Sequence, residues 1–124
     1  MNEDYVSYEV AKLLKEKKFH WNCHACYDPR GESKELLVQE GISNVCYSVV
    51  YAAPTLYMAQ KWLREEKEIH IMNDVCASGY YAVLWKTNGT FIKTMADKGP
   101  NDGGVWDTYE QCLNDAILEA LKLI

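Results

Sequence analysis

A helix-like pattern of apolar residues lies near the middle of the chain. Leu56, Ala59 and Leu63 recur at helical spacing, and charged and amide side chains take the opposite face. Pro54 suits the first helical turn, because its ring fixes the backbone angle and its missing N–H would have no partner there. We therefore predict an amphipathic helix over residues 54–67 that lies with one face on a core.

Two further helices are predicted towards the ends of the sequence. Over residues 6–17 the apolar positions form one stripe, and Ser7 suits the N-cap. Over residues 107–124 the apolar positions again share one face. Asp107 is the predicted N-cap of this last helix, with Glu110 three residues on, as in a capping box. The last helix should cover one side of a sheet.

Strand signals occupy the sequence between the helices. Runs of β-branched and aromatic residues, or of alternating apolar and polar residues, indicate strands. Asn88 and Gly89 stand between two such runs and predict a tight hairpin, since both central residues of that turn take positive φ. The predicted strands are a short edge strand at residues 36–38 and longer strands at residues 45–52, 69–75, 80–86 and 91–95.

The order of these elements predicts the fold class. Helix-strand-helix-strand-strand-strand-helix is most simply satisfied by an α+β fold, in which an antiparallel sheet of about four strands carries three helices. The chain has 124 residues, of which 48% are hydrophobic, so it is long enough for a real core. No repeat, low-complexity tract or linker divides it. We predict a single α+β domain over residues 1–124.

Composition narrows the partners and the compartment. There are 13 basic and 18 acidic residues, a formal net charge of −5, so nucleic acid and acidic membranes are unlikely partners. The opening MNEDYVSYE lacks the apolar core of a secretory signal. No stretch approaches the about 20 apolar residues that a membrane-spanning helix needs. We expect a cytoplasmic protein without membrane association, whose five cysteines are free thiols.

Metal-ligand residue types cluster in a stretch predicted to be a loop, residues 20–31. His20, Cys23, His24 and Cys26 fall within seven residues, and the two cysteines have the spacing of a zinc knuckle. A strong zinc signal needs a second, distant pair of ligands, and the other cysteines are scattered singly. Two hypotheses follow: a small zinc-binding module that uses these four residues, and a loop with reactive or half-buried thiols and no metal.

No pattern typical of catalysis or of cofactor binding stands out. A catalytic pair of one of the five cysteines with His70 or His24 is the last alternative, but none of the cysteines lies in a nucleophile elbow or beside an oxyanion-loop pattern. His70 lies between Ile69 and Ile71, so on a strand its side chain points to the opposite face from both. The glycine-rich residues 99–104 lack the spacing of a phosphate-binding loop. We expect no catalytic site and no bound cofactor other than the zinc of the alternative hypothesis.

RNA binding is a further alternative, suggested by the order of elements in the second half. Residues 54–67, three strands and residues 107–124 follow the α-β-β-β-α order of double-stranded RNA-binding domains, and residues 12–18 supply a basic helix end. Those domains bind phosphate at the start of the last helix. Here Asp107 and Glu110 would repel it, so the order of elements is an analogy alone.

Aromatic residues are numerous in the predicted strands. The chain has nine Tyr and four Trp, and Trp85 shares a strand face with Tyr81 and Val83. The opposite face of that strand is also apolar, which is typical of a strand in the middle of a sheet or at an interface. An aromatic strand face open to solvent would suit self-association or a protein partner, and ordinary core packing is the alternative.

Three blocks of the sequence resemble one family. They are SYEVAKLLKEK at residues 7–17, APTLYMAQKWLRE followed by IHI at residues 53–71, and YEQCLNDAILEALKLI at residues 109–124. These blocks resemble a family of small uncharacterised proteins from gut anaerobes and their mobile elements. The resemblance implies no particular chemistry, since no activity is established for that family. Taken together, the observations favour a non-enzymatic, intracellular accessory protein that acts through protein–protein contacts, with a homodimer as one form of them.

Overall fold

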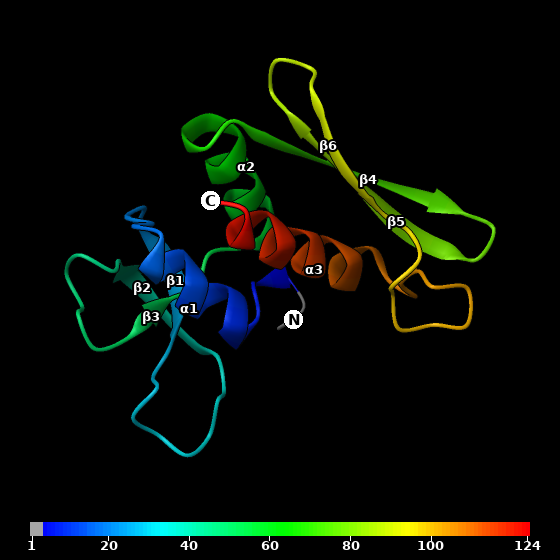
Figure 1. Cartoon of the computed structure of the whole chain (residues 1–124). Coiled ribbons are helices and arrows are strands. Elements are labelled where there is room, and N and C mark those ends of the chain that lie inside the picture. Colours follow the sequence, from blue (N-terminus) through cyan, green and yellow to red (C-terminus); the bar gives the residue numbers. More distant parts are fainter. Residues whose placement is uncertain (1–3) are drawn as a thin grey trace. The chain divides into compact units, whose positions relative to one another are not determined.

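The computed structural model describes residues 4–124 and has the α+β fold that the sequence predicts (Figure 1). Within these residues, no helix has the length and apolar character that crossing a membrane requires. The elements follow one another as α1 (Tyr8–Glu16), β1 (Cys23–Tyr27), β2 (Leu37–Ile42), β3 (Tyr51–Ala52), α2 (Leu56–Glu66), β4 (Ile69–Cys76), β5 (Gly79–Lys86), β6 (Phe91–Met95) and α3 (Tyr109–Lys122).

The described strands form two antiparallel sheets, where the sequence predicted one sheet of about four strands. The chain groups into two compact units, the first ending at Met58 and the second beginning at Ala59, and each is described by itself. All strands of sheet β2-β1-β3 precede α2 in the sequence. In sheet β4-β5-β6, consecutive strands are joined by short turns. Each sheet is therefore built from neighbouring segments of the chain. The prediction of a single domain stays a prediction.

In the first unit, helix α1 packs on β1 and β3. Its N-cap is Ser7, as predicted, and the Ser7 hydroxyl accepts a hydrogen bond from the N–H of Val10 at 3.3 Å. Leu14 and Phe19 are completely buried in the core. The hydroxyl of Tyr27 donates to the carbonyl of Val6 at 2.7 Å, which ties the end of β1 to the segment that leads into α1.

The prediction of a loop over residues 20–31 is wrong, because this segment contains strand β1. β1 is the central strand of its sheet and pairs with both β2 and β3. Three of its five side chains in a row, from Ala25 to Tyr27, are buried, so the strand lacks the alternation by which a half-exposed strand is found. Because β1 is buried on both sides, its short sequence does not alternate between apolar and polar residues, and the strand could not be predicted from the sequence.

The strand predicted over residues 45–52 is reduced to the two residues of β3, and turns replace the rest. Side chains just before this segment supply the reason. The Ser43 hydroxyl accepts from the N–H of Cys46 at 3.1 Å, and the Asn44 side-chain oxygen accepts from the N–H of Ala52 at 2.9 Å. Such side-chain bonds to the backbone compete with the hydrogen bonds of a sheet.

In the second unit, β4, β5 and β6 lie close to the predicted positions, and β5 is the central strand. A hairpin joins β5 and β6 at Asn88 and Gly89, as predicted, but its turn differs from the prediction: φ is positive at Gly89, +93°, and not at Asn88, and the N–H of Gly89 donates to the carbonyl of Lys86 at 2.9 Å. A hydrogen bond of 3.0 Å from the N–H of Thr90 to the Asn88 side-chain oxygen closes this turn. The turn chemistry thus fixes the register of the last two strands.

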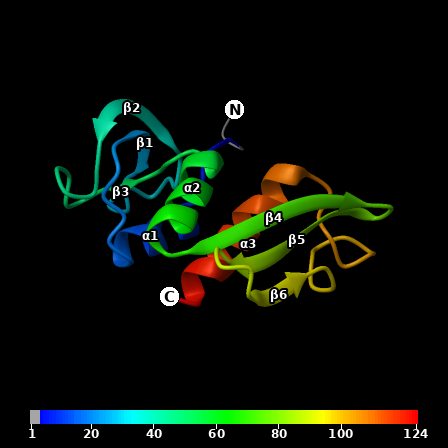
Figure 2. The ribbon, with the colours of Figure 1, turned by 90° about the horizontal axis from the view of Figure 1, so that it is seen from above.

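Helix α3 covers one face of this sheet (Figures 1 and 2). Ile71 of β4 and Leu84 of β5 are opposite each other in the register and are 1% and 0% exposed, on the face that α3 covers. The apolar face predicted for this helix is buried, and consists of Cys112, Leu113, Ala116, Ile117, Ala120 and Leu121. The packing of this helix on this sheet forms the core of the second unit.

The caps of the two later helices differ from prediction by one residue or more. Thr108, rather than Asp107, is the N-cap of α3, and its hydroxyl accepts the N–H of Gln111 at 3.1 Å. Asp107 instead accepts a hydrogen bond from Asn101 at 3.0 Å. Helix α2 begins after Thr55, whose hydroxyl accepts the N–H of Met58 at 3.2 Å. A threonine hydroxyl adjacent to the first turn provides the cap in both helices.

Candidate functional site

Three of the four residues of the proposed zinc cluster, Cys23, His24 and Cys26, lie in β1, and His20 lies just before the strand. Cys23 and Cys26 are 1% and 3% exposed, whereas His20 and His24 are exposed to solvent. Successive side chains of a strand point to opposite faces, so His24 points away from the buried Cys23. Within residues 4–124, no three His, Cys, Asp or Glu side chains are grouped closely enough to hold a metal ion.

Burial also acts on the chemistry of these thiols. It raises the pKa of Cys23 to about 12, and burial together with the charge of Asp28 raises the pKa of Cys26. Zinc binds cysteine as the thiolate, so ligation would require both thiols to ionise and the strand to rearrange. The zinc module stays a prediction, and its four residues are not gathered around a common point in this structure.

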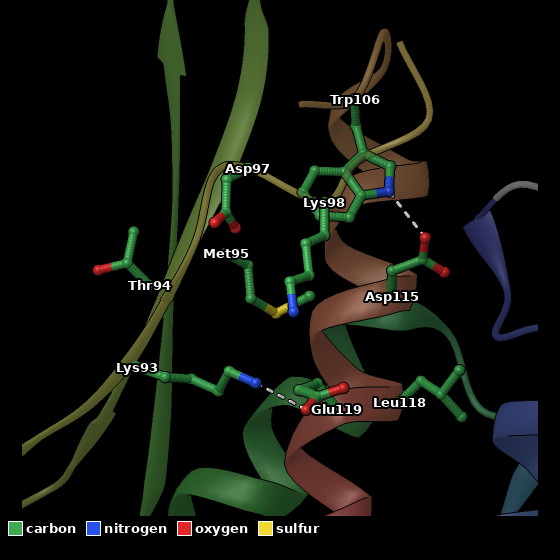
Figure 3. Close-up of a pocket in the computed structure, with 9 residues that line it drawn as sticks. All are labelled: Lys93, Thr94, Met95, Asp97, Lys98, Trp106, Asp115, Leu118 and Glu119. Atoms are coloured by element: carbon green, nitrogen blue, oxygen red, sulfur yellow. Dashed lines mark hydrogen bonds and ion pairs between the residues drawn. The ribbon is translucent and has the colours of Figure 1, made fainter. Parts of the chain in front are cut away.

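A pocket of about 590 Å³ lies in the second unit, between β6, α3 and the loop that joins them (Figure 3). It is lined by Lys93, Thr94 and Met95 of β6, Asp97, Lys98 and Trp106 of the loop, and Asp115, Leu118 and Glu119 of α3. The loop is held by Asn101, whose side-chain oxygen accepts the N–H groups of Gly103 and Val105, both at 3.0 Å. The Trp106 backbone pairs with Tyr80 of β5, which fixes the loop to the sheet.

Two polar contacts cross the pocket from the loop and the sheet to α3. The indole N–H of Trp106 donates to Asp115 Oδ2 at 2.7 Å, and Lys93 Nζ lies 2.8 Å from Glu119 Oε1. The pKa of Glu119 lies below its ordinary value, first because Lys93 donates this hydrogen bond, and then through the attraction of Lys93 and more distant lysines that include Lys98. Both carboxylates are therefore held in fixed positions.

The second unit also has an open sheet face, on the side opposite to α3. The register places eight side chains on this open face: His70, Met72 and Asp74 of β4, Tyr81, Val83 and Trp85 of β5, and Phe91 and Thr94 of β6. Phe91 is 53% exposed and Met72 is 36% exposed. The rings of Trp85 and Phe91 meet edge to face, with centroids 5.6 Å apart. The open face thus has accessible apolar side chains, Met72 in its middle and Phe91 towards the β5–β6 turn.

The two ends of the open face differ in charge. At the end near the β5–β6 turn, a depression of about 480 Å³ is lined by Arg64, His70, Trp85 and Lys86, together with two residues of the turn. Towards the other end lies Asp74, two residues beyond Met72 on β4 and exposed to solvent. Arginine and lysine are positive at neutral pH and aspartate is negative. The open face therefore has a cationic end and an anionic residue across its apolar middle.

Sequence reasoning identified part of this surface. Trp85, Tyr81 and Val83 share one face of the central strand, as predicted, and His70 points to the opposite side from its two buried isoleucine neighbours. Met72 and Phe91 were not singled out, although alternation along β4 and β6 could have placed them on this face. The pocket beside α3 was missed altogether, because its lining comes from three segments whose approach depends on the fold.

The chain matches no protein-family model, no curated protein and no solved structure. The resemblance to small proteins of gut anaerobes therefore stays a prediction. The α-β-β-β-α order is present in α2 to α3, with Glu110 in the first turn of α3, where it opposes phosphate. RNA binding by this order of elements also stays a prediction.

Proposed function

We propose that the chain is an intracellular, non-enzymatic accessory protein that acts through protein–protein contacts, and that it pairs with a second copy of itself through the open face. The observation that carries the proposal is the set of exposed apolar side chains on that face, with Met72 in its middle and Phe91 beside Trp85 towards the β5–β6 turn. Aromatic residues and methionine are enriched at interfaces, and each side chain of this size contributes about 1.5–3 kcal/mol when it becomes fully buried.

The pattern of charge favours a second copy as the occupant. Met72 lies midway between His70 and Asp74 on β4. If a two-fold axis crosses the strands at Met72, it turns the second copy end for end and stacks the two open faces. Asp74 of each copy then lies over the cationic depression of the other, and the apolar middles meet. Stacked sheets pack about 10 Å apart with nearly aligned strands, a geometry that this arrangement satisfies.

The test is sedimentation velocity over a range of protein concentrations. We expect the native chain to sediment as a dimer and the Met72→Asp variant to sediment as a monomer, because two aspartates would meet at the axis. Val38→Asp is the matched control, since Val38 of β2 is 73% exposed and belongs to the first unit. This variant should remain a dimer.

Two results would refute the proposal. One is a native chain that stays monomeric at its highest soluble concentration. The other is a Met72→Asp variant that dimerises as strongly as the native chain. A loss of dimer in Val38→Asp but not in Met72→Asp would move the interface to the first unit. Circular dichroism of each variant checks that it is folded.

A further inference from the structure

We infer that the pocket between β6 and α3 binds a small zwitterion that carries an ammonium group and a carboxylate, of the class of free amino acids. This inference is independent of the proposed dimer, because the pocket lies on the side of the sheet that faces α3. Its volume of about 590 Å³ falls within the range of about 300–1,000 Å³ that is usual for small-molecule sites.

One part of the pocket presents an anchored carboxylate. Trp106, which is 3% exposed, donates its indole N–H to Asp115 Oδ2 at 2.7 Å. Asp115 Oδ1 accepts no hydrogen bond from any residue of the described part of the chain. A carboxylate held on one oxygen and free on the other is suited to receive an ammonium group.

Another part of the pocket presents ammonium groups. The Lys98 side chain extends into the space between Trp106 and the Lys93–Glu119 pair (Figure 3). Lys98 has no hydrogen bond or ion pair among residues 4–124. The ammonium group of Lys93 has three N–H donors and donates one of them to Glu119 at 2.8 Å, which leaves two for a ligand. A ligand carboxylate placed beside Lys98 would be attracted by the positive charges of both Lys98 and Lys93.

The lining selects against ligands of a single charge. A purely anionic ligand would meet Asp97 and Asp115, and a purely cationic ligand would meet Lys98. Met95 supplies apolar surface between these groups, and Leu118 lines the pocket from α3 (Figure 3). The complementary ligand is therefore a molecule with both charges and an apolar body, which describes an amino acid with a large apolar side chain.

The experiment follows the indole N–H resonance of Trp106 by NMR while each of the standard free amino acids is added. We expect at least one of them to shift this resonance, with a Kd at or below about 1 mM. Its N-acetyl form lacks the ammonium group and its amide form lacks the carboxylate, so each should bind at least about tenfold more weakly.

Variants assign the two charged ends. Lys98→Met keeps the length of the side chain, and Asp115→Asn keeps an oxygen for the indole N–H, so both should fold and both should weaken binding about tenfold. Asp102→Asn is the control, because Asp102 is exposed in the same loop and does not line the pocket. The inference is overturned if no amino acid shifts the resonance, if the blocked forms bind as tightly, or if both pocket variants bind like the control.

Discussion

The indole of Trp106 ties the loop after β6 to helix α3, so its loss should lower the stability of the second unit. The perturbation is Trp106→Phe, which keeps an aromatic ring in a site that is 3% exposed and removes the N–H that lies 2.7 Å from Asp115 Oδ2. The variant therefore separates the hydrogen bond from most of the burial. Asp115→Asn tests the same contact from the other side, by keeping an oxygen and removing its charge.

The structure gives the expected size of the effect. A hydrogen bond to a charged group contributes about 1.5–3 kcal/mol, and the lower half of that range applies because Asp115 lines an open pocket where water can replace the indole. The smaller ring buries less apolar surface, which adds about 1 kcal/mol. We expect Trp106→Phe to lower the free energy of unfolding by about 3 kcal/mol. Asp115→Asn should lower it by about 1 kcal/mol, because a neutral hydrogen bond remains.

The assay is urea unfolding followed by far-ultraviolet circular dichroism. The free energies of unfolding are compared between variants that have the same slope of free energy against urea concentration. All variants are made in the monomeric Met72→Asp background, so that the proposed dimer does not add to the measured stability. Trp85→Phe is the control, because Trp85 is half-buried on the open face and its indole N–H has no hydrogen-bond partner among residues 4–124. Its cost should stay below about 1 kcal/mol. The double variant Trp106→Phe with Asp115→Asn should cost less than the sum of the single variants, since both changes act on the same contact.

The reasoning is refuted if Trp106→Phe costs no more than Trp85→Phe. It is also refuted if the two changes at Trp106 and Asp115 are additive. Either result would mean that the contact contributes nothing measurable and that burial of the ring alone holds the loop.

Three further predictions concern thiols, a glycine and an ion pair. In the folded protein Cys46 and Cys76 should react with a thiol reagent at least about tenfold faster than the three buried cysteines, two of which have a pKa raised to about 12 by burial; equal rates would contradict this. Gly79→Ala should cost on the order of 3 kcal/mol in urea unfolding, because φ is +143° and the added carbon would lie 2.3 Å from a backbone oxygen, whereas Gly89→Ala, with open space around it, should cost clearly less. Glu119→Gln should cost at most about 1 kcal/mol at neutral pH, and this cost should shrink as the pH falls below 4.5, because the pKa of Glu119 is lowered in the fold and the pair is lost as the pH falls through the folded value; a cost that does not change with pH would contradict this.

The second unit was the more predictable part of the fold. Alternation along β4, the place of the hairpin at Asn88–Gly89 and the long apolar stripe of α3 are local signals that agree with the structure, although φ is positive only at Gly89 of the two turn residues. Where local signals and tertiary packing coincide, a pattern of residues is enough. The cap of α3 moved from Asp107 to Thr108 because both side chains can accept the N–H groups of a first turn, and the sequence cannot rank them.

The first unit was less predictable because its structure depends on contacts between distant segments. Strand β1 is buried among partners on both sides, which removes its alternation. The β-rich residues 45–50 form turns although their composition favours a strand, and Lys15 of α1 reaches this segment, where its ammonium donates to the carbonyls of Ser48 and Val50. A pairing between residues more than thirty positions apart has no local signature.

The candidate sites divide in the same way. The aromatic face of β5 follows from alternation, so Trp85 and its two neighbours on the strand were found from the sequence. The ligand pocket joins Lys98 of a loop to Asp115 and Glu119 of a helix, and nothing in the spacing of these residues indicates that they meet. The Cys23–Cys26 spacing, in contrast, predicted a zinc site whose four residues the structure does not gather around one point. Both thiols are buried in β1, which the spacing of the residues does not indicate.

The central claim, a dimer stacked end for end through the open face, is tested most directly by a charge swap measured in sedimentation equilibrium. Arg64→Glu and Asp74→Arg should each weaken the dimer by about tenfold, because each places like charges together at both ends of the interface. The double variant restores opposite charges in the proposed pairing, and we predict that its dimer is about as tight as the native one. A double variant that dimerises no better than the weaker single variant would contradict this arrangement.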